Sequence, residues 1–332
     1  MFIATIDTGT TNTRVKLWQE GKVLTSSHVG VGVRDTGITG SKDKLKKGVK
    51  DAIDLALNKA NITHHDVELF LASGMITSNV GLFEVPHVFA PAGVTELAKK
   101  MVSATIQEVV DQPIWFVPGV KNNIQEITVE NCEAMDIMRG EEVETIGLLD
   151  HLNVSGPTLL VLPGSHSKFV RVDQNSRISG CVTTLAGELL SVLTTDTILA
   201  SSLEKSFAET LDPEMVLQGA EYSRKFGLTR TCFTVRLLDL FTDSSLNGRA
   251  NFLAGAIVAT DLLAVKSSSV MGDCRELPVI IGGSNIMAGI IETFLHQDDY
   301  FHGDLITVKS DIMKDKAGYG AILAARSRGL CT

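Results

Sequence analysis

The chain begins with a strand, a tight turn and a second strand, and a related segment follows in its second half. In residues 3–18 an apolar run ends in Asp7, Gly9 opens a run of hydroxyl residues, and an alternating run follows. Residues 159–173 repeat this order, with Gly164 in the place of Gly9. Apolar runs and alternation bounded by turn residues predict paired strands. Two copies of one hairpin predict a chain built from two related α/β halves.

The first turn has the composition of a phosphate site. Gly9 is expected to adopt a positive φ and to let a phosphate approach the backbone. Turn amides can cradle a polyphosphate, helped by neighbouring polar side chains: Thr10, Thr11, Asn12 and Thr13. Asp7 is placed to hold Mg²⁺, which proteins usually bind through one or two carboxylates plus substrate phosphates. The plain alternative is a hairpin with a threonine-rich turn.

The second turn, Gly164-Ser165-His166, is predicted to hold phosphate oxygens. His166 is either a polar turn residue that faces phosphate or a general base. Lys168 aligns with Thr13 of the first copy, and as a point charge it can steady a phosphate or a substrate carboxylate. The alternative for Lys168 is an exposed lysine on a strand.

A third glycine-rich turn, Gly282-Gly283-Ser284, follows a short apolar strand and precedes a helix over 286–296. Backbone amides and the positive end of a helix dipole suit a nucleotide. Each turn alone is a weak signal, whereas three turns in this order indicate a nucleotide-binding chain.

A candidate for proton transfer lies between the two hairpins. Gly140 is followed by Glu141 and Glu142, and apolar positions at helical spacing then predict a helix. Carboxylates in a first helical turn are favoured by the helix dipole, which is the purely structural explanation. The alternative is a catalytic base that orients an attacking hydroxyl in phosphoryl transfer.

The composition excludes several classes of protein. The 332 residues are 44% hydrophobic and 21% charged, with a net charge of −9, which argues against a nucleic-acid partner. The lysines of 42–50 are expected on the exposed face of a helix. Five dispersed cysteines without metal-ligand spacing favour a reducing compartment. No export signal is visible, and the apolar stretch 251–265 is expected to be too short to span a membrane. A cytoplasmic protein without a membrane partner is predicted.

Turn residues at 151–157 mark the expected boundary between domains at 1–152 and 153–332. The final helix, near 314–325, is expected to fold back on the first domain. Other segments are expected to be strands at 23–29, 67–72, 114–117, 178–184, 279–282 and 305–309, and helices at 42–60, from 185, at 213–226, 234–241 and 251–265. This order gives mixed sheets covered by helices.

Four segments together resemble one family. They are Ile6-Asp-Thr-Gly-Thr-Thr-Asn-Thr-Arg14, Ser73-Gly-Met-Ile-Thr-Ser-Asn-Val-Gly81, Met138-Arg-Gly-Glu-Glu142 and Leu162-Pro-Gly-Ser-His-Ser-Lys168. They resemble the 2-dehydro-3-deoxygalactonokinase family, within the hexokinase/actin/Hsp70 ATPase superfamily. The resemblance implies two ribonuclease-H-like (actin-like ATPase) domains, each a mixed β-sheet flanked by helices, with a nucleotide cleft between them.

The resemblance also implies a reaction, in which ATP phosphorylates the terminal 6-hydroxyl of 2-dehydro-3-deoxy-D-galactonate in galactonate catabolism. Asp7 would organise Mg²⁺, and Glu141 would be the catalytic base. The phosphate clamps would be Gly9 to Thr11 and Gly164 to Ser165, with residues 282–284 as the adenosine shelf. Gly74, Ser78, Asn79, Arg139 and Lys168 would contact the sugar acid.

The sequence departs from the family pattern before Met138, where a polar run is expected and Glu133-Ala-Met-Asp136 stands. This departure leaves open a kinase for a related sugar acid or sugar. An ATPase switch and a phosphatase on the same fold are separate alternatives. The expected partners are ATP and a small sugar acid, and a homodimer is left open.

Overall fold

The computed structural model describes residues 1–283 and 285–332, which form two compact units. Unit 1 comprises residues 1–156, 172–180 and 313–332, and unit 2 comprises residues 157–171 and 181–312. Segments distant in the sequence therefore meet within unit 1.

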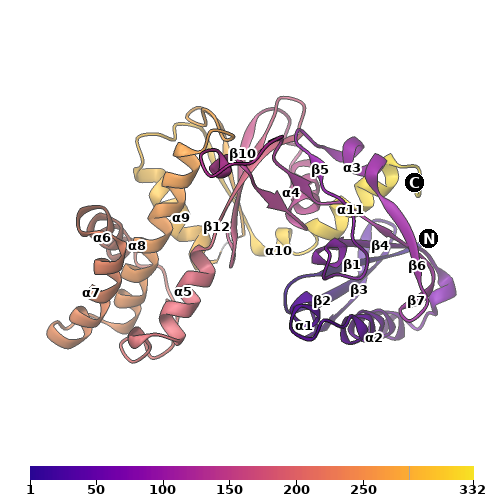
Figure 1. Cartoon of the computed structure of the whole chain (residues 1–332), viewed down its shortest axis with the longest axis horizontal. Coiled ribbons are helices and arrows are strands. Elements are labelled where there is room, and N and C mark those ends of the chain that lie inside the picture. Colours follow the sequence, from indigo (N-terminus) through magenta and orange to yellow (C-terminus); the bar gives the residue numbers. More distant parts are fainter. Residues whose placement is uncertain (284) are drawn as a thin grey trace. The chain divides into compact units, whose positions relative to one another are not determined.

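Unit 1 contains a six-stranded sheet in the order β3-β2-β1-β4-β7-β6 (Figure 1). β1 pairs antiparallel with β2 and parallel with β4. A smaller sheet has the order β5-β8-β9. The strands are β1 Phe2–Thr8, β2 Thr13–Gln19, β3 Lys22–Val29, β4 Val67–Gly74, β5 Val88–Phe89, β6 Val102–Ile106, β7 Val110–Phe116, β8 Val120–Lys121 and β9 Ile137–Met138.

Alternation along β1 assigns the two faces of this sheet to different helices. Ala4 and Ile6 join the buried cluster that contains the apolar stripe of α2. Thr5 faces the opposite side, where its Oγ1 accepts a hydrogen bond from Trp18 Nε1 at 2.8 Å and where α11 packs. The helices are α1 Val33–Thr39, α2 Asp43–Ala60, α3 Val94–Lys100, α4 Glu141–His151 and α11 Lys316–Ser327, with 3-10 turns η1 His64–Asp66, η2 Met75–Thr77 and η3 Cys132–Ala134.

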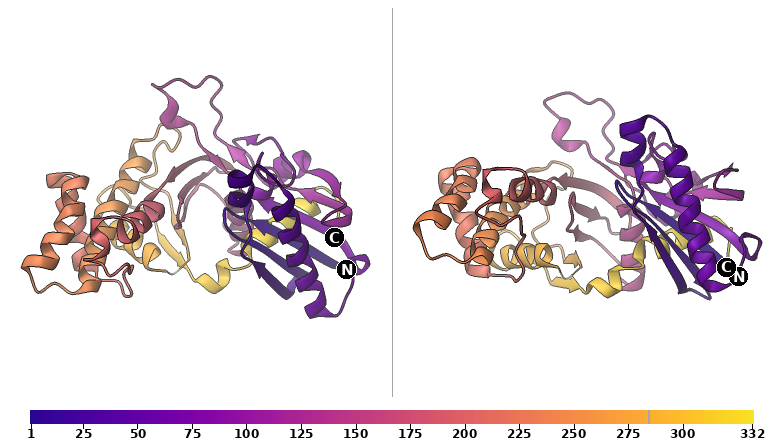
Figure 2. Two further views of the ribbon diagram at one scale, coloured as in Figure 1. Left: turned by 60° about the horizontal axis from the view of Figure 1, so that its bottom comes forward. Right: turned by 90° about the horizontal axis from the view of Figure 1, so that it is seen from below.

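The last helix, α11, lies against α4 and also contacts α3, β4 and β1 (Figure 1). Tyr319 on α11 donates a hydrogen bond from its hydroxyl to Asp150 Oδ2 at 2.6 Å. Lys16 on β2 pairs with Asp315, directly before α11, at 2.8 Å. Both termini of the chain accordingly lie in unit 1, next to each other in the views of Figure 2.

A second, five-stranded sheet has the order β12-β11-β10-β13-β14, with β10, β13 and β14 parallel. Its strands are β10 Thr158–Leu162, β11 Ser167–Val172, β12 Ile178–Thr184, β13 Val279–Gly282 and β14 Leu305–Val308. The remaining helices are α5 Ala186–Thr195, η4 Ile198–Ala200, α6 Pro213–Phe226, α7 Leu228–Phe241, α8 Leu246–Ser267, α9 Ile286–Gln297 and α10 Ser310–Met313.

α8 is the central helix of unit 2 and packs against α6, α7, α5 and α9 (Figure 1). It spans 22 residues, so the helix expected near 251–265 is present and extends beyond both expected ends. Its extra length comes from an N-cap at Ser245, whose Oγ accepts a hydrogen bond from the Gly248 amide at 3.0 Å. The helix is long and apolar enough to cross a membrane, but 67% of its most apolar window is buried, as in a core helix.

Three further differences from the expected elements concern α7, β6 and α1. α7 begins at Leu228 rather than Thr234, directly after Gly227. An edge strand, β6, pairs antiparallel with β7 and was not predicted. The segment after β3 forms a separate helix, α1, before the lysine-rich α2.

Candidate active site

The first hairpin forms as predicted, with β1 and β2 antiparallel and Asp7 opposite Arg14. The Gly9 amide donates to Asn12 O at 2.9 Å and closes the turn. Thr10 and Thr11 are exposed, so their side chains are accessible. Asn12 is held from two sides: its Nδ2 donates to Thr11 Oγ1 at 2.9 Å, and its Oδ1 lies 2.8 Å from His28 Nε2.

Two details of this turn differ from the expectation. Gly9 does not have a positive φ, and a Cβ placed on it would be 4.0 Å from its nearest neighbour, so the space beside the backbone is open. Thr13 is fully buried, and its hydroxyl donates to Val31 O at 2.9 Å. Alternation along β2 points Thr13 into the core with Val15, so its hydroxyl anchors the hairpin and does not face the turn.

The second turn carries a side-chain hydrogen bond that the sequence did not indicate. His166 Nε2 lies 2.6 Å from Glu188 Oε2 on α5, and both side chains are partly exposed. Lys168 is buried, with 8% of its surface exposed, and its Nζ donates to Thr183 Oγ1 at 2.6 Å. The alternative of an exposed strand lysine was therefore wrong.

The two turns are supported in the same way within their own units. A Cβ on Gly32 would lie 2.4 Å from Thr10 O, and a Cβ on Gly187 would lie 2.3 Å from Gly164 O. Amides at the following helix starts donate to turn carbonyls, from Arg34 to Thr10 O at 2.9 Å and from Glu188 to Ser165 O at 3.0 Å. Each hairpin turn thus rests on a glycine and a helix start.

Asp7 lies at the end of β1, in register with Ser73 of β4. A Cβ on Gly74, whose φ is +84°, would be 2.8 Å from Asp7 Oδ1, so glycine leaves room for this carboxylate. Arg14 Nη1 is 3.5 Å from Asp7 Oδ2. Burial raises the pKa of Asp7, against the lowering effect of Arg14 and Lys16.

α4 starts beside the same point, because a Cβ on Gly140 would be 3.4 Å from the Gly74 Cα. Glu141, the first residue of α4, is half-buried, and its Oε2 accepts from the Arg139 amide at 3.2 Å. Glu142 is fully buried, and its Oε2 accepts from the Gly140 amide at 2.7 Å. The structure therefore brings the start of α4, which carries Glu141, next to Gly74 and the end of β1 in unit 1.

Two carboxyl groups of α4 have strongly raised pKa values. Burial, and secondly the charge of Glu141, raises the pKa of Glu142 to about 8. Burial, with the charges of Glu141 and Asp7, raises the pKa of Glu144 to about 8 as well. Glu144 was not predicted as a site residue, although its place one helical turn after Gly140 is the signal that could have found it.

Arg139 precedes α4 and holds the segment after β4. Its Nη1 donates to Thr77 Oγ1 at 2.6 Å, and its Nη2 donates to Val85 O at 2.8 Å and lies 3.3 Å from His87 Nδ1. Burial, with the charges of Arg139 and Lys121, lowers the pKa of His87 to about 4. A neutral His87 can accept from Arg139. No motif in the sequence singled out His87.

The residues expected to line a sugar-acid pocket differ in exposure. Ser78 is buried, and its hydroxyl donates to Met75 O at 2.7 Å within the turn that follows β4. Asn79 is exposed. Gly74 has no polar side chain, and its contribution is the space that it leaves for the Asp7 carboxylate.

The third turn follows β13, where Gly282 and Gly283 are buried and Gly283 has a φ of +99°. Asn285 caps α9, since its Oδ1 accepts from the Ala288 amide at 2.9 Å. Ser284, the remaining residue of the predicted adenosine shelf, lies outside the described residues.

Solved structures share the fold of this chain. A protein from Sinorhizobium meliloti named as a 2-dehydro-3-deoxygalactonokinase has a TM-score of 0.74 at 24% identity, covering 98% of this chain and 96% of its own. Component A of (R)-2-hydroxyglutaryl-CoA dehydratase from Acidaminococcus fermentans has a TM-score of 0.51 at 11% identity, covering 98% and 99%. These likenesses establish the fold, including the predicted mixed sheets flanked by helices.

Sequence comparisons identify the family. A "Probable 2-dehydro-3-deoxygalactonokinase" of Rhizobium meliloti (strain 1021) is 25% identical over 280 residues, covering 82% of this chain and 84% of the relative. The 2-dehydro-3-deoxygalactonokinase of Escherichia coli (strain K12) is 28% identical over 198 residues, covering 60% and 58%. The protein is a carbohydrate kinase. A profile described as 2-keto-3-deoxy-galactonokinase matches residues 7–300, and the chain belongs to that family, as its motifs predicted.

Proposed function

We propose that this kinase transfers the γ-phosphoryl group of ATP to the 6-hydroxyl of 2-dehydro-3-deoxy-D-galactonate, a step of galactonate catabolism. Membership of the family supports this substrate. The observation that carries the mechanism is the convergence of Asp7, Gly74 and Glu141 at the ends of β1 and β4 and the start of α4. A carboxylate there can act on a sugar hydroxyl while a second one serves the phosphates.

The turns Gly9–Thr11 and Gly164–Ser165 would hold the phosphates of one nucleotide, and residues 282–284 would hold its adenosine. The lack of a side chain at Gly9 and Gly164 fits this role, because a Cβ there would have no neighbour closer than 4.0 Å and 3.9 Å, respectively. Asp7 fits a magnesium site as a single carboxylate beside such a turn. Mg²⁺ bound there would neutralise charge that develops on the phosphate oxygens.

Glu141 would accept the proton of the sugar hydroxyl as the hydroxyl attacks the γ-phosphorus. Closure around the substrates would exclude water, the competing acceptor. For the substrate carboxylate we assign Arg139, because guanidinium binds carboxylate through two parallel hydrogen bonds. Its contacts with described residues use one N–H of Nη1 and both N–H groups of Nη2, so a bidentate carboxylate would replace the Nη2 contact with Val85 O or with His87 Nδ1. Lys168 would act on the phosphates.

The substrate classes implied by this assignment are ATP and a small sugar acid. We propose a cytoplasmic enzyme without a nucleic-acid or membrane partner, in line with the net charge of −9. The domain boundary at 152/153 and the role of 282–284 remain parts of this proposal.

An ATP-consumption screen over 2-keto-3-deoxy acids, aldonates and neutral hexoses tests the assignment. The highest kcat/KM is expected for 2-dehydro-3-deoxy-D-galactonate, with the phosphate on O6 as located by phosphorus–proton NMR. Glucose reacting equally well would contradict the sugar-acid assignment. Phosphate release without any acceptor, at the rate seen with acceptor, would indicate a phosphatase or an ATPase switch instead.

A further inference from the structure

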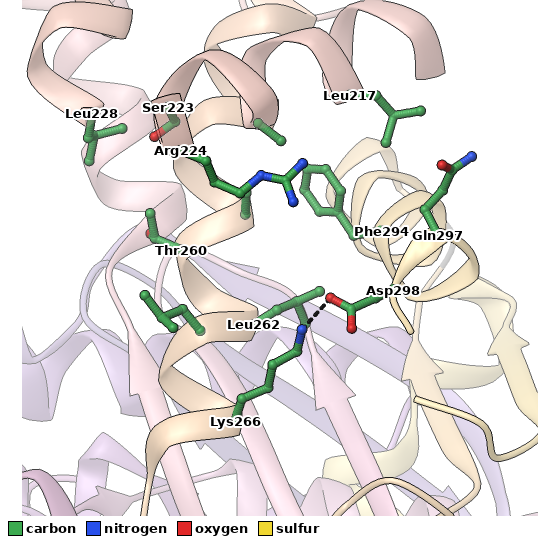
Figure 3. A pocket seen from close by; sticks show the side chains of 13 residues that line it. Leu217, Ser223, Arg224, Leu228, Thr260, Leu262, Lys266, Phe294, Gln297 and Asp298 are labelled. Carbon is green, nitrogen blue, oxygen red and sulfur yellow. Dashed lines mark hydrogen bonds and ion pairs between the residues drawn. The ribbon is translucent and has the colours of Figure 1, made fainter. Parts of the chain in front are cut away.

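Unit 2 contains a cavity of about 460 Å³ between α6, α8 and α9 (Figure 3). Its walls are mainly apolar and include Leu217 on α6, Leu262 on α8 and Phe294 on α9. Cavities of roughly 300–1,000 Å³ with apolar walls and a few converging polar groups are typical ligand sites.

Two cations, Lys266 and Arg224, face this cavity, and they differ in their partners among the described residues. Lys266 forms an ion pair with Asp298, and its Nζ lies over the rings of Tyr300 and Phe301 at 5.5 and 5.7 Å (Figure 3). Arg224 extends from α6 across the cavity toward Phe294. Within 1–283 and 285–332, no hydrogen bond or ion pair of its guanidinium is found. The cavity therefore presents the positive charge of an exposed arginine above an apolar wall.

The cavity is separate from the predicted nucleotide turn. That turn precedes the first residue of α9, whereas the cavity is lined by Phe294, Gln297 and Asp298 at the other end of the helix. With a rise of 1.5 Å per residue, the 12 residues of α9 span about 18 Å. A nucleotide on the turn would not fill this cavity.

We propose that the cavity binds a small amphipathic organic anion, with its apolar body against Leu217, Leu262 and Phe294 and its acidic group on Arg224. An acid is favoured over a cation because the free charge is positive. An apolar body is favoured because the three named walls are hydrocarbon. This ligand site does not depend on the identity of the sugar substrate.

The test uses 8-anilinonaphthalene-1-sulfonate, a fluorescent aromatic anion, with the full chain and excess MgADP to fill the nucleotide site. One site per chain is expected. Arg224→Gln should weaken binding by about tenfold or more, as expected for loss of a hydrogen bond to a charged group. Lys225→Gln is the matched control. Lys225 follows Arg224 in the chain, but it does not line the cavity and its Nζ lies over the ring of Phe226, so binding should be unchanged.

Two further arms separate charge from shape. N-phenyl-1-naphthylamine, which has the same rings without the sulfonate, should bind about tenfold more weakly. Leu217→Trp should fill the cavity and abolish binding, and circular dichroism would verify that each variant is folded. Equal binding to Arg224→Gln, equal affinity for the neutral probe, or weaker binding of the anion with MgADP than without it would each overturn the proposal. The proposal would also be overturned if the chain bound the anion as a monomer but not after associating with a second copy, because the cavity would then be an interface between copies.

Discussion

Glu141 and Glu142 are neighbours in the first turn of α4, yet they lie in different surroundings. Consecutive helical residues point about 100° apart. Glu141 is half-buried beside the residues around Asp7, whereas Glu142 is fully buried and accepts a hydrogen bond from the Gly140 amide. Burial of Glu142 supports Glu141 as the group that reaches a substrate.

Glu141→Gln should lower kcat by roughly 10²–10⁴, the range for a positioned general base, with little change in the KM for ATP. Glu142→Gln should have a milder effect, because the glutamine carbonyl can still accept from Gly140. Steady-state kinetics on both variants check this. A larger effect at Glu142 would make Glu142 the base, and no effect at either residue would direct attention to His166.

Glu142 also predicts a pH dependence of stability. Its pKa is raised from 4.5 to about 8, so the folded state retains a proton that the unfolded state has lost. The associated stability is fully present below about pH 4.5 and is lost as pH rises through about 8, at up to roughly 1.4 kcal/mol per pH unit. Urea unfolding between pH 5 and 9 should show a smaller decline for Glu142→Gln than for the natural chain. An equal decline would contradict the burial effect at Glu142, with Glu144 still contributing in both proteins.

The sequence predicted Asp7 and Glu141 because each stands at a recognisable boundary, the end of an apolar run or the start of a helix. It did not predict His87, whose pKa of about 4 and contact with Arg139 depend on burial by segments distant in the chain. The sequence also placed the Thr13 hydroxyl in the turn, whereas alternation along β2 directs this hydroxyl to the carbonyl oxygen of Val31. Local patterns identify which residues end a strand, but they do not identify what lies across from them.

At the scale of elements, the two hairpins share a support that lies outside the hairpins themselves. In unit 1 the glycine is Gly32, the N-cap of α1, with an extended backbone at φ −146° and ψ −172°. Alanine tolerates this conformation, so the effect of a substitution there would be steric. In unit 2 a Cβ on Gly187, in the first turn of α5, would likewise be too close to the carbonyl oxygen of Gly164.

Gly32→Ala should destabilise the protein by roughly 1–3 kcal/mol, as overpacking does, and should raise the KM for ATP by displacing Thr10. Gly37→Ala, five positions later in α1, is the matched control. A Cβ there meets nothing within 4 Å, and alanine should stabilise the helix by roughly 0.5–1 kcal/mol. Thermal unfolding and ATP kinetics check both variants. An unchanged KM for Gly32→Ala would argue against phosphate binding at this turn.

The hairpins and α2 were predictable because their periodicity is local: Leu45, Val49, Ile53 and Leu57 recur at helical spacing, and all are buried. The short edge strand β6 and the start of α7 were missed. β6 forms because it pairs with β7, and α7 starts where it does because Gly227 precedes it. These boundaries depend on partners and on backbone geometry rather than on a repeating pattern.

At the scale of the whole molecule, unit 1 is discontinuous, because residues 313–332 belong to it. α11 buries Ala321, Ile322, Ala324 and Ala325 on the side of the sheet where α4 lies. Since α4 carries Glu141, the position of the candidate base depends on a segment about 170 residues further along the chain.

Removal of residues 313–332 should abolish activity and cooperative unfolding of unit 1. The truncation removes the apolar contacts of α11, and the free energy of unfolding of a native protein is only about 5–15 kcal/mol. Removal of residues 330–332, which leaves α11 intact, should leave both nearly unchanged. Activity assays and circular dichroism on the two truncated chains make the comparison. Full activity of the shorter chain would show that α11 does not position α4.

The path of the chain also sets an order of events during translation. The sheet of unit 1 emerges from the ribosome early, but α11 follows only after the segment that forms unit 2 has been made. Domains generally fold as units, and the N-terminal one folds first during synthesis. The nascent first unit must therefore persist with the face that receives α11 uncovered, and the candidate base reaches its final setting among the last parts of the protein.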